Sequence, residues 1–401
     1  MPTFTYVART RDGKRETGKM TAENRQVLVR TLQGKGMVPE RVDAVGAKKA
    51  RRDPKVKTSE LLVFTRQLST IVNAGLPLLQ GLDILAEQTE DPRYALVIQG
   101  IAEDVEAGET FSDALRKHPR IYSDLFVSMI RAGEASGNLD GVLMQLADYL
   151  EAMEDLKRRI RSAMTYPVVA LSMILLIAAG LVIFVVPQFA EIFAGFDKAL
   201  PAPTRILIAA SDFLKQWYGT PLIIAAIIGV VVAIRMYGST STGRLHLDAI
   251  KLRLPIFGKL LRKVAISRFA RTLSTLTRSG VNILGAMEIV ERTAGNEVFA
   301  RAISNAADCV RNGETLADPL ARSGQFPAMV TRMIGVGEKT GALEQMLQKV
   351  SDFYDSEVRA SVDALTSMIE PILILMMGIV VGGIVVALFM PILQLSGLVQ
   401  Q

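Results

Sequence analysis

Cysteine and histidine are scarce in this sequence of 401 residues, which has one cysteine, Cys309, and two histidines, His118 and His246. A single cysteine excludes a disulfide framework within the chain and any metal site built from several cysteines. The two histidines are far apart in the sequence, so we do not expect a histidine-based metal or catalytic cluster. The N-terminal residues also lack the apolar core of a secretory signal peptide.

Charged residues make up 21% of the chain, whereas hydrophobic residues make up 50% and the mean hydropathy is +0.29. This mixture is typical of a membrane protein with substantial soluble parts. The net charge of +6 is modest, and nucleic acid, anionic lipid or the basic flanks of membrane helices would each account for it. Charge alone therefore identifies no partner.

One unit of the chain occurs twice. With a shift of 205 residues, the segment starting at Phe64 matches the segment starting at Phe269 at eight of twenty-one positions. The same shift pairs 108–110 with 313–315, and a one-residue gap then pairs 133–137 with 337–341. A repeat of this length indicates that one structural unit is built twice. The identical pairs are Phe64/Phe269, Arg66/Arg271, Leu68/Leu273, Ser69/Ser274, Thr70/Thr275, Gly75/Gly280, Leu79/Leu284 and Ile84/Ile289.

Apolar residues at spacings of three and four, interrupted by glycine or proline, predict five or six amphipathic helices in each copy. Short connections between such helices favour an antiparallel bundle. The first forty or so residues instead predict a small α+β module. It would contain a strand near Phe4, a hairpin turn at Asp12-Gly13, a return strand over 16–21 and a helix over 22–33. A basic linker follows, which is either a solvated tether or a patch for acidic lipid or nucleic acid.

Three uncharged apolar runs are long enough to cross a bilayer: 168–186, 216–234 and 372–390. None has an ionisable residue in its interior, which argues against a transport or proton pathway. Gly378 and Gly382 form a small-residue face for close packing of the last run against another helix. Basic residues flank the runs on the sides that place the N-terminus and both repeated units in the cytoplasm.

The fold class is therefore an all-α polytopic membrane protein with two repeated cytoplasmic helical bundles, three transmembrane helices and a small α+β N-terminal module. We predict this order: the N-terminal module at 1–45, a basic linker at 46–58, the first bundle at 59–165, the first transmembrane helix at 166–188, a periplasmic segment at 189–215, the second transmembrane helix at 216–236, a cytoplasmic region at 237–369 with the second bundle at about 264–369, the third transmembrane helix at 370–391 and a short periplasmic tail at 392–401.

The segment Gly337-Glu338-Lys339-Thr340-Gly341 resembles part of a phosphate-binding loop. A Walker loop requires a glycine directly before its Lys-Thr, and here Glu338 occupies that position. The first copy also has Ala135 where the second has Lys339. We therefore interpret both segments as a helix ended by glycine and followed by a capped helix, with Ser136 and Thr340, or Asn138, as the caps.

No nucleophile–base pair, metal cluster or nucleotide loop is visible in the soluble parts. The residues thus predict a non-enzymatic membrane scaffold that presents two similar helical bundles to cytosolic partners. A membrane-anchored helical regulator or receptor scaffold is the alternative function, and a transporter subunit is a third.

The repeated motifs also resemble a known family. Phe64-Thr65-Arg66-Gln67-Leu68, the run 74–79, the segment 133–139, Tyr166-Pro167 and Glu370-Pro371 are similar to the GspF/PilC inner-membrane platform proteins of type II secretion and type IV pilus systems. The resemblance implies a multi-pass protein of the bacterial inner membrane with its N-terminus in the cytoplasm. It also implies a homo-oligomer that couples a cytoplasmic assembly ATPase to pilin or pseudopilin polymerisation, beside other inner-membrane assembly proteins and lipid. No nucleic acid and no required cofactor are implied. The second copy has Asn282 where the first has Pro77, and Thr272 where the first has Gln67. These differences indicate that the two copies meet different partners.

Some members of this family carry a divalent-cation site, and the resemblance implies Ca²⁺ at Glu151 and Asp155 with the main-chain oxygen of Val97. Two carboxylates one helical turn apart suit a hard cation. The neighbouring Lys157 and Arg158 leave a solvated face of mixed charge as the alternative. Arg359 stands where Asp155 would repeat, so no second site is expected.

Overall fold

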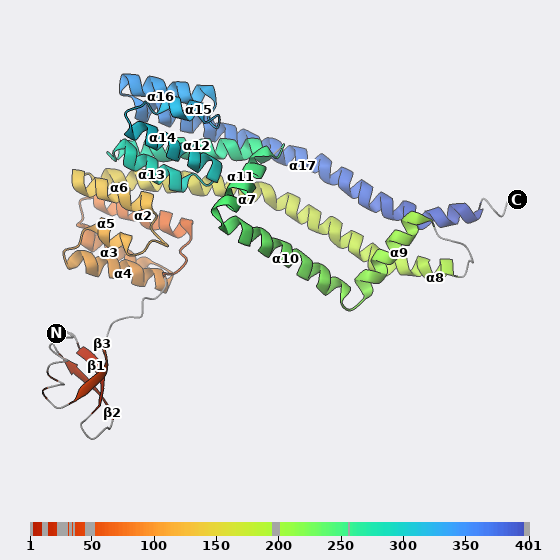
Figure 1. Ribbon diagram of the computed structural model, residues 1–401, viewed down its shortest axis with the longest axis horizontal. Coiled ribbons are helices and arrows are strands. Elements are labelled where there is room, and N and C mark those ends of the chain that lie inside the picture. The colour runs from red at the N-terminus through yellow and green to blue at the C-terminus, as the bar shows by residue number, and fades with distance from the viewer. Residues whose placement is uncertain are drawn as a thin grey trace. The chain divides into compact units, whose positions relative to one another are not determined.

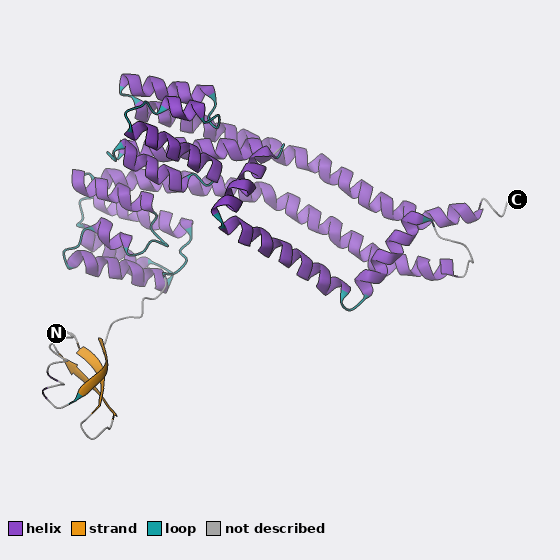
Figure 2. Cartoon of the chain, viewed as in Figure 1, coloured by secondary structure: helices purple, strands orange, loops and turns teal. Residues whose placement is uncertain are grey.

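The computed structural model describes residues 3–9, 15–21, 31, 34, 37–44, 53–194, 201–255 and 257–396. The chain divides into two compact units, Met1–Lys55 and Val56–Gln401. The first contains an antiparallel sheet of order β2-β1-β3, made of β1 (Thr3–Arg9), β2 (Arg15–Thr21) and β3 (Val38–Ala44). Figure 2 shows these strands, and Tyr6 of β1 is opposite Gly18 of β2 and Val42 of β3.

The predicted return strand is confirmed by β2, and β3 was not predicted. The Asp12-Gly13 turn, most of the helix predicted over 22–33 and most of the basic linker lie outside the described residues. The α+β class of this module therefore stays a prediction, of which the structure describes the sheet.

The first copy of the repeat forms six helices within the continuously described stretch 53–194. They are α2 (Thr58–Asn73), α3 (Leu78–Gln88), α4 (Pro92–Glu106), α5 (Phe111–Arg116), α6 (Asp124–Ser136) and α7 (Leu139–Gly180). On α2, Leu61, Phe64 and Leu68 of the predicted apolar stripe are buried in the core. A π-helical turn, η1 (Leu181–Val185), and α8 (Val186–Ala194) extend α7.

The second copy repeats this arrangement with six helices in the described stretch 257–396. They are α12 (Phe257–Arg278), α13 (Ile283–Thr293), α14 (Glu297–Arg311), α15 (Ala317–Arg322), α16 (Ala328–Thr340) and α17 (Leu343–Ser396). Between the copies are α9 (Ala202–Lys215), α10 (Gly219–Ser239) and α11 (Ser241–Arg253). Six helices in each copy confirm the prediction of five or six.

In the described part of the chain, three helical segments are long and apolar enough to cross a membrane: Leu139–Phe189, Pro221–Ser239 and Leu343–Pro391. Pro167 and Pro371 lie inside α7 and α17, so the last helix of each bundle continues without a break into its apolar segment. Figure 1 shows α7 and α17 leaving the bundles in the same direction. The middle segment belongs to α10, which begins at Gly219, after Trp217 and Tyr218.

The segment between the first two apolar helices contains α9, which packs on the far end of α17. Leu207 and Ile208 of α9 contact the cluster of Ile384 and Leu388, and the Thr204 hydroxyl donates to the Ala387 carbonyl at 2.5 Å. The close packing expected at Gly378 and Gly382 is absent within the described chain, because no other helix comes within 4 Å of a Cβ built at either glycine.

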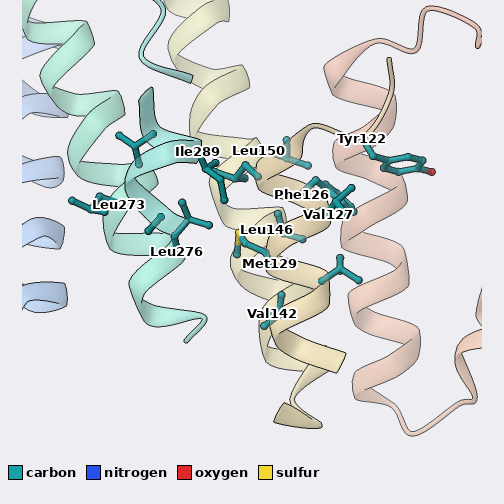
Figure 3. Close-up of a cluster of buried hydrophobic side chains, with 14 of the residues drawn as sticks. Tyr122, Phe126, Val127, Met129, Val142, Leu146, Leu150, Leu273, Leu276 and Ile289 are labelled. Atoms are coloured by element: carbon teal, nitrogen blue, oxygen red, sulfur yellow. The ribbon is translucent and has the colours of Figure 1, made fainter. Parts of the chain in front are cut away.

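The two bundles share one hydrophobic core. Buried residues of both copies form a single cluster that runs from Leu61 to Tyr354. Figure 3 shows Leu146 and Leu150 of α7 and Met129 of α6 facing Leu276 of α12 and Ile289 of α13. The sequence predicted two bundles, and the structure shows that they are packed directly against one another.

Candidate functional site

The glycine- and glutamate-containing motif of each copy has a structural role. The Glu134 carboxylate accepts the backbone N–H of Phe111 at 2.6 Å and that of Ser112 at 3.1 Å. The Glu338 carboxylate likewise accepts the backbone N–H of Leu316 and, at 3.0 Å, that of Ala317. Each carboxylate thus satisfies the free N–H groups at the start of the short helix α5 or α15, where negative charge is favoured.

The glycines around these carboxylates are required by packing and by backbone conformation. A Cβ at Gly133 would lie 3.1 Å from Val142, and one at Gly337 would lie 2.8 Å from the Cα of Leu343, so only glycine lets the helices approach this closely. Gly137 and Gly341 end α6 and α16 with φ of 70°. The glutamate and the glycines of the motif therefore have structural roles, and each segment ends a helix at a glycine, as the sequence predicted.

The predicted caps at this turn are wrong. The hydroxyls of Ser136 and Thr340 each donate at 2.8 Å to a carbonyl one turn back, those of Ala132 and Val336, and therefore cap no following helix. Asn138 does occupy the position before α7, but its side chain makes no capping hydrogen bond.

A polar cavity of about 350 Å³ lies where α7 and α17 meet. Equivalent positions of the repeat line it from both copies: Asp148 and Asp352, Glu151 and Asp355, and Asp155 and Arg359, together with Ala152, Leu156, Arg159 and Arg271. Residues that are 204 positions apart in sequence are thus brought to one place. This juxtaposition is the candidate functional site of the paired bundles.

The equivalent arginines of this site are in different environments. Arg66 pairs with Glu151 and, at 3.0 Å, with Asp148, and its side chain is 41% exposed. Arg271 pairs with Asp355, and both side chains are 18% exposed. Burial lowers the pKa of Arg271, because a charge removed from water is less stable there, and the nearby Asp352 opposes the change. The second copy therefore buries an ion pair that the first leaves at the surface.

The residues of the calcium prediction are partly brought together. Glu151 and Asp155 line the cavity, whereas Val97 is on α4, buried in the core of the first copy, and does not line it. The Arg66 guanidinium already occupies the Glu151 carboxylate. Among the residues that the structure describes, no three His, Cys, Asp or Glu side chains are arranged to hold a metal ion. Calcium binding stays a prediction from the resemblance.

A larger polar cavity, of about 910 Å³, lies between α11, α13 and α14 and was not anticipated from the sequence. Arg244, Lys251, Arg292 and Arg301 line it together with three acidic residues. One of these, Asp248, is buried, accepts the N–H of Glu297 at 2.9 Å and pairs with Lys251 at 2.8 Å. Asp248 therefore docks α11, which follows α10, on the start of α14.

These features define a class: a polytopic membrane scaffold made of a duplicated helical domain, in which each bundle is continuous with an apolar helix. The chain belongs to the family described as type II secretion system (T2SS), protein F, which matches residues 64–187 and 269–391. The N-terminal domain of the same family matches residues 1–43.

Proteins from several bacteria are similar to the chain over their whole length. It is 40% identical to the type IV pilus assembly protein PilC of Myxococcus xanthus, covering 99% of this chain and 96% of that protein. It is 41% identical to PilC of Thermus thermophilus, covering 99% of both. It is 35% identical to the type II secretion system protein F of Vibrio cholerae, covering 100% of both.

Proposed function

We propose that this protein is the inner-membrane platform of a type IV pilus or type II secretion machine, and that it couples a cytoplasmic assembly ATPase to polymerisation of pilins or pseudopilins. Its membership of a family with relatives in both systems carries the proposal. The N-terminus and both bundles then face the cytoplasm, in line with the basic flanks of the apolar segments.

The continuity of α7 and α17 supports a mechanical role. α7 has 42 residues and α17 has 54. At about 1.5 Å per residue, α17 is about 80 Å long, more than twice the ~30 Å thickness of the hydrocarbon core. Each of these helices begins in the core of a bundle and continues into its apolar segment without leaving the helical conformation, so a displacement of the bundle is passed along the helix.

The shared core supports coupling between the two bundles. Because interiors are close-packed, a push on one bundle moves the other instead of compressing the contact. The chain supplies no chemistry in this role: the ATPase provides the energy, and the platform transmits its conformational change to the membrane-held subunits.

Co-purification with an assembly ATPase of the same organism, followed by measurement of ATP turnover with and without this protein, tests the proposal. We expect a stable complex and a changed turnover rate, and loss of filaments in a strain that lacks the protein while the subunits remain inserted in the membrane. Intrinsic ATP hydrolysis by the pure protein, or normal filaments in its absence, would contradict the proposal.

A further inference from the structure

The two copies of the repeat contact one another through different faces. Within the bundles, the first copy presents α6 and α7, and the second presents α12 and α13. Nearer the apolar segments, α7 also packs directly against α17. Three polar contacts cross the boundary: Tyr149 to Thr272 at 3.4 Å, Ser279 to Gln145 at 2.9 Å, and Arg292 to Asp124 at 2.7 Å. The contact between the bundles is therefore head to tail, and each bundle has one face that meets no equivalent partner in the described part of the chain.

The unused faces are exposed at all six equivalent positions. In the second copy, the positions of Tyr149, Gln145 and Asp124 are taken by the exposed residues Phe353, Lys349 and Ala328. In the first copy, the positions of Thr272, Ser279 and Arg292 are taken by the exposed residues Gln67, Ala74 and Glu87. Figure 1 shows α16 and α3 on opposite ends of the stacked bundles.

The unused face of the second copy exposes three apolar side chains. Phe353 is 45% exposed, and on α16 Met329 and Val336, about two turns apart, are 40% and 52% exposed. The residue equivalent to Met329 in the first copy is Leu125, which is 2% exposed. Exposed apolar side chains of this size, one of them at a position that the first copy buries, mark a docking face.

The opposite face, on α2 and α3, is a partly uncovered version of the surface that the second copy buries. Ile71 and Ile84 are half-buried, whereas their equivalents Leu276 and Ile289 are buried in the shared core. A groove of about 600 Å³ opens beside them, lined by Val63 and Gln67 among others. In the second copy the longer Arg268 occupies the position of Val63, and its guanidinium lies over Gly295.

The charges of the two faces are complementary. Arg332, Lys339 and Lys349 are exposed on α16 and α17, and Asp83 and Glu87 are exposed on α3. Opposite charges on faces that meet steer association and set its register. Within the chain, Asp124 of the first copy pairs with Arg292 of the second. Ala328 is equivalent to Asp124, and Arg332 lies one helical turn after it. Arg332 is therefore placed to pair with Glu87, the equivalent of Arg292, on a second chain.

We propose that a second copy of this chain docks its α16–α17 face (Met329, Arg332, Val336, Phe353) on the α2–α3 face of the first (Gln67, Ile71, Ile84, Glu87), repeating between chains the contact that joins the two bundles within a chain. Phe353 of one chain then lies at Gln67 of the next. Because α7 and α17 leave the bundles in the same direction (Figure 1), the apolar helices of each added chain keep that direction, and the head-to-tail contact builds an oligomer in the plane of the membrane.

Site-specific cross-linking of the purified full chain tests this arrangement, in a Cys309→Ser background. Phe353→Cys together with Gln67→Cys should give a ladder of multimers with a short bismaleimide. A direct disulfide between these two cysteines is not suitable. The contact is made by a side chain as long as tyrosine, so the Cα atoms of the two positions are too far apart for a disulfide bond. The matched control, Tyr149→Cys with Thr272→Cys, should link within the chain, consuming both thiols without forming multimers.

Charge exchange provides an independent measurement. Either Glu87→Arg or Arg332→Glu should shift the light-scattering mass of the detergent-solubilised protein toward the 43.7 kDa monomer, and the double variant should restore the larger mass. A wild-type monomer would overturn the proposal. A cross-linked dimer from Phe353→Cys alone, in the yield that the pair of variants gives, would overturn it too, since it would indicate a face-to-face contact. The test needs no ATPase or filament, so its failure is distinguishable from failure of the platform function.

Discussion

Arg271 of α12 is ion-paired with Asp355 of α17 inside the second copy, beside the first copy's Tyr149, and the Ser267 hydroxyl also donates to Asp355. The equivalent Arg66 makes its pairs at the surface of the first copy. The repeat thus provides a natural comparison of one ion pair in two environments.

Arg271→Met should destabilise the protein by about 3 kcal/mol, because it leaves a mostly buried carboxylate without its partner. Arg66→Met should cost less than about 1 kcal/mol, because both carboxylates that it contacts remain hydrated. Thermal unfolding of the two variants in the same detergent provides the comparison. Equal losses would mean that the two pairs are equally exposed in solution.

Glu338→Gln should destabilise the second bundle by about 1–2 kcal/mol, because the carboxylate clamps two N–H groups at the start of α15. Thr340→Val is the matched control, since its hydroxyl only donates back to Val336, and it should change the melting temperature little. If ATP or phosphate protected the wild-type protein but not Glu338→Gln, the structural interpretation of this motif would be wrong.

Calcium at the millimolar level should raise the melting temperature of the wild-type protein by mass action on the folded state. Glu151→Gln with Asp155→Asn should abolish that rise. Arg66→Gln should enlarge it, because the guanidinium that occupies Glu151 is removed. A wild-type protein with no calcium-dependent shift would end the calcium prediction.

Topology reporters fused after Val56 and near Gly295 should both indicate the cytoplasm, and a reporter near Ala202 should indicate the periplasm. The expectation follows from the basic residues beside the three apolar segments. A periplasmic signal at Gly295 would be incompatible with three spans.

Most of the architecture was predictable because it depends on local properties of the chain. An apolar run that is long enough to cross a bilayer is recognised from composition alone, and the repeat is recognised from residues such as Arg66 and Arg271 at a fixed shift. The return strand β2 and the left-handed glycines that end α6 and α16 follow from equally local rules. The caps at Ser136 and Thr340 failed because a hydroxyl in the last turn has a carbonyl one turn back within reach.

Tertiary structure alone decided which of two equivalent faces is covered. Tyr149 and Phe353 occupy the same position of the repeat and are similar in size, yet Tyr149 packs against the other copy while Phe353 is exposed. The same holds for Leu276 and Ile71. Periodicity identifies an apolar face of a helix but not its neighbour, because the neighbour is brought there by packing between residues far apart in the chain. A chain with two copies joined head to tail contains one such contact, and it leaves one face of each copy uncovered.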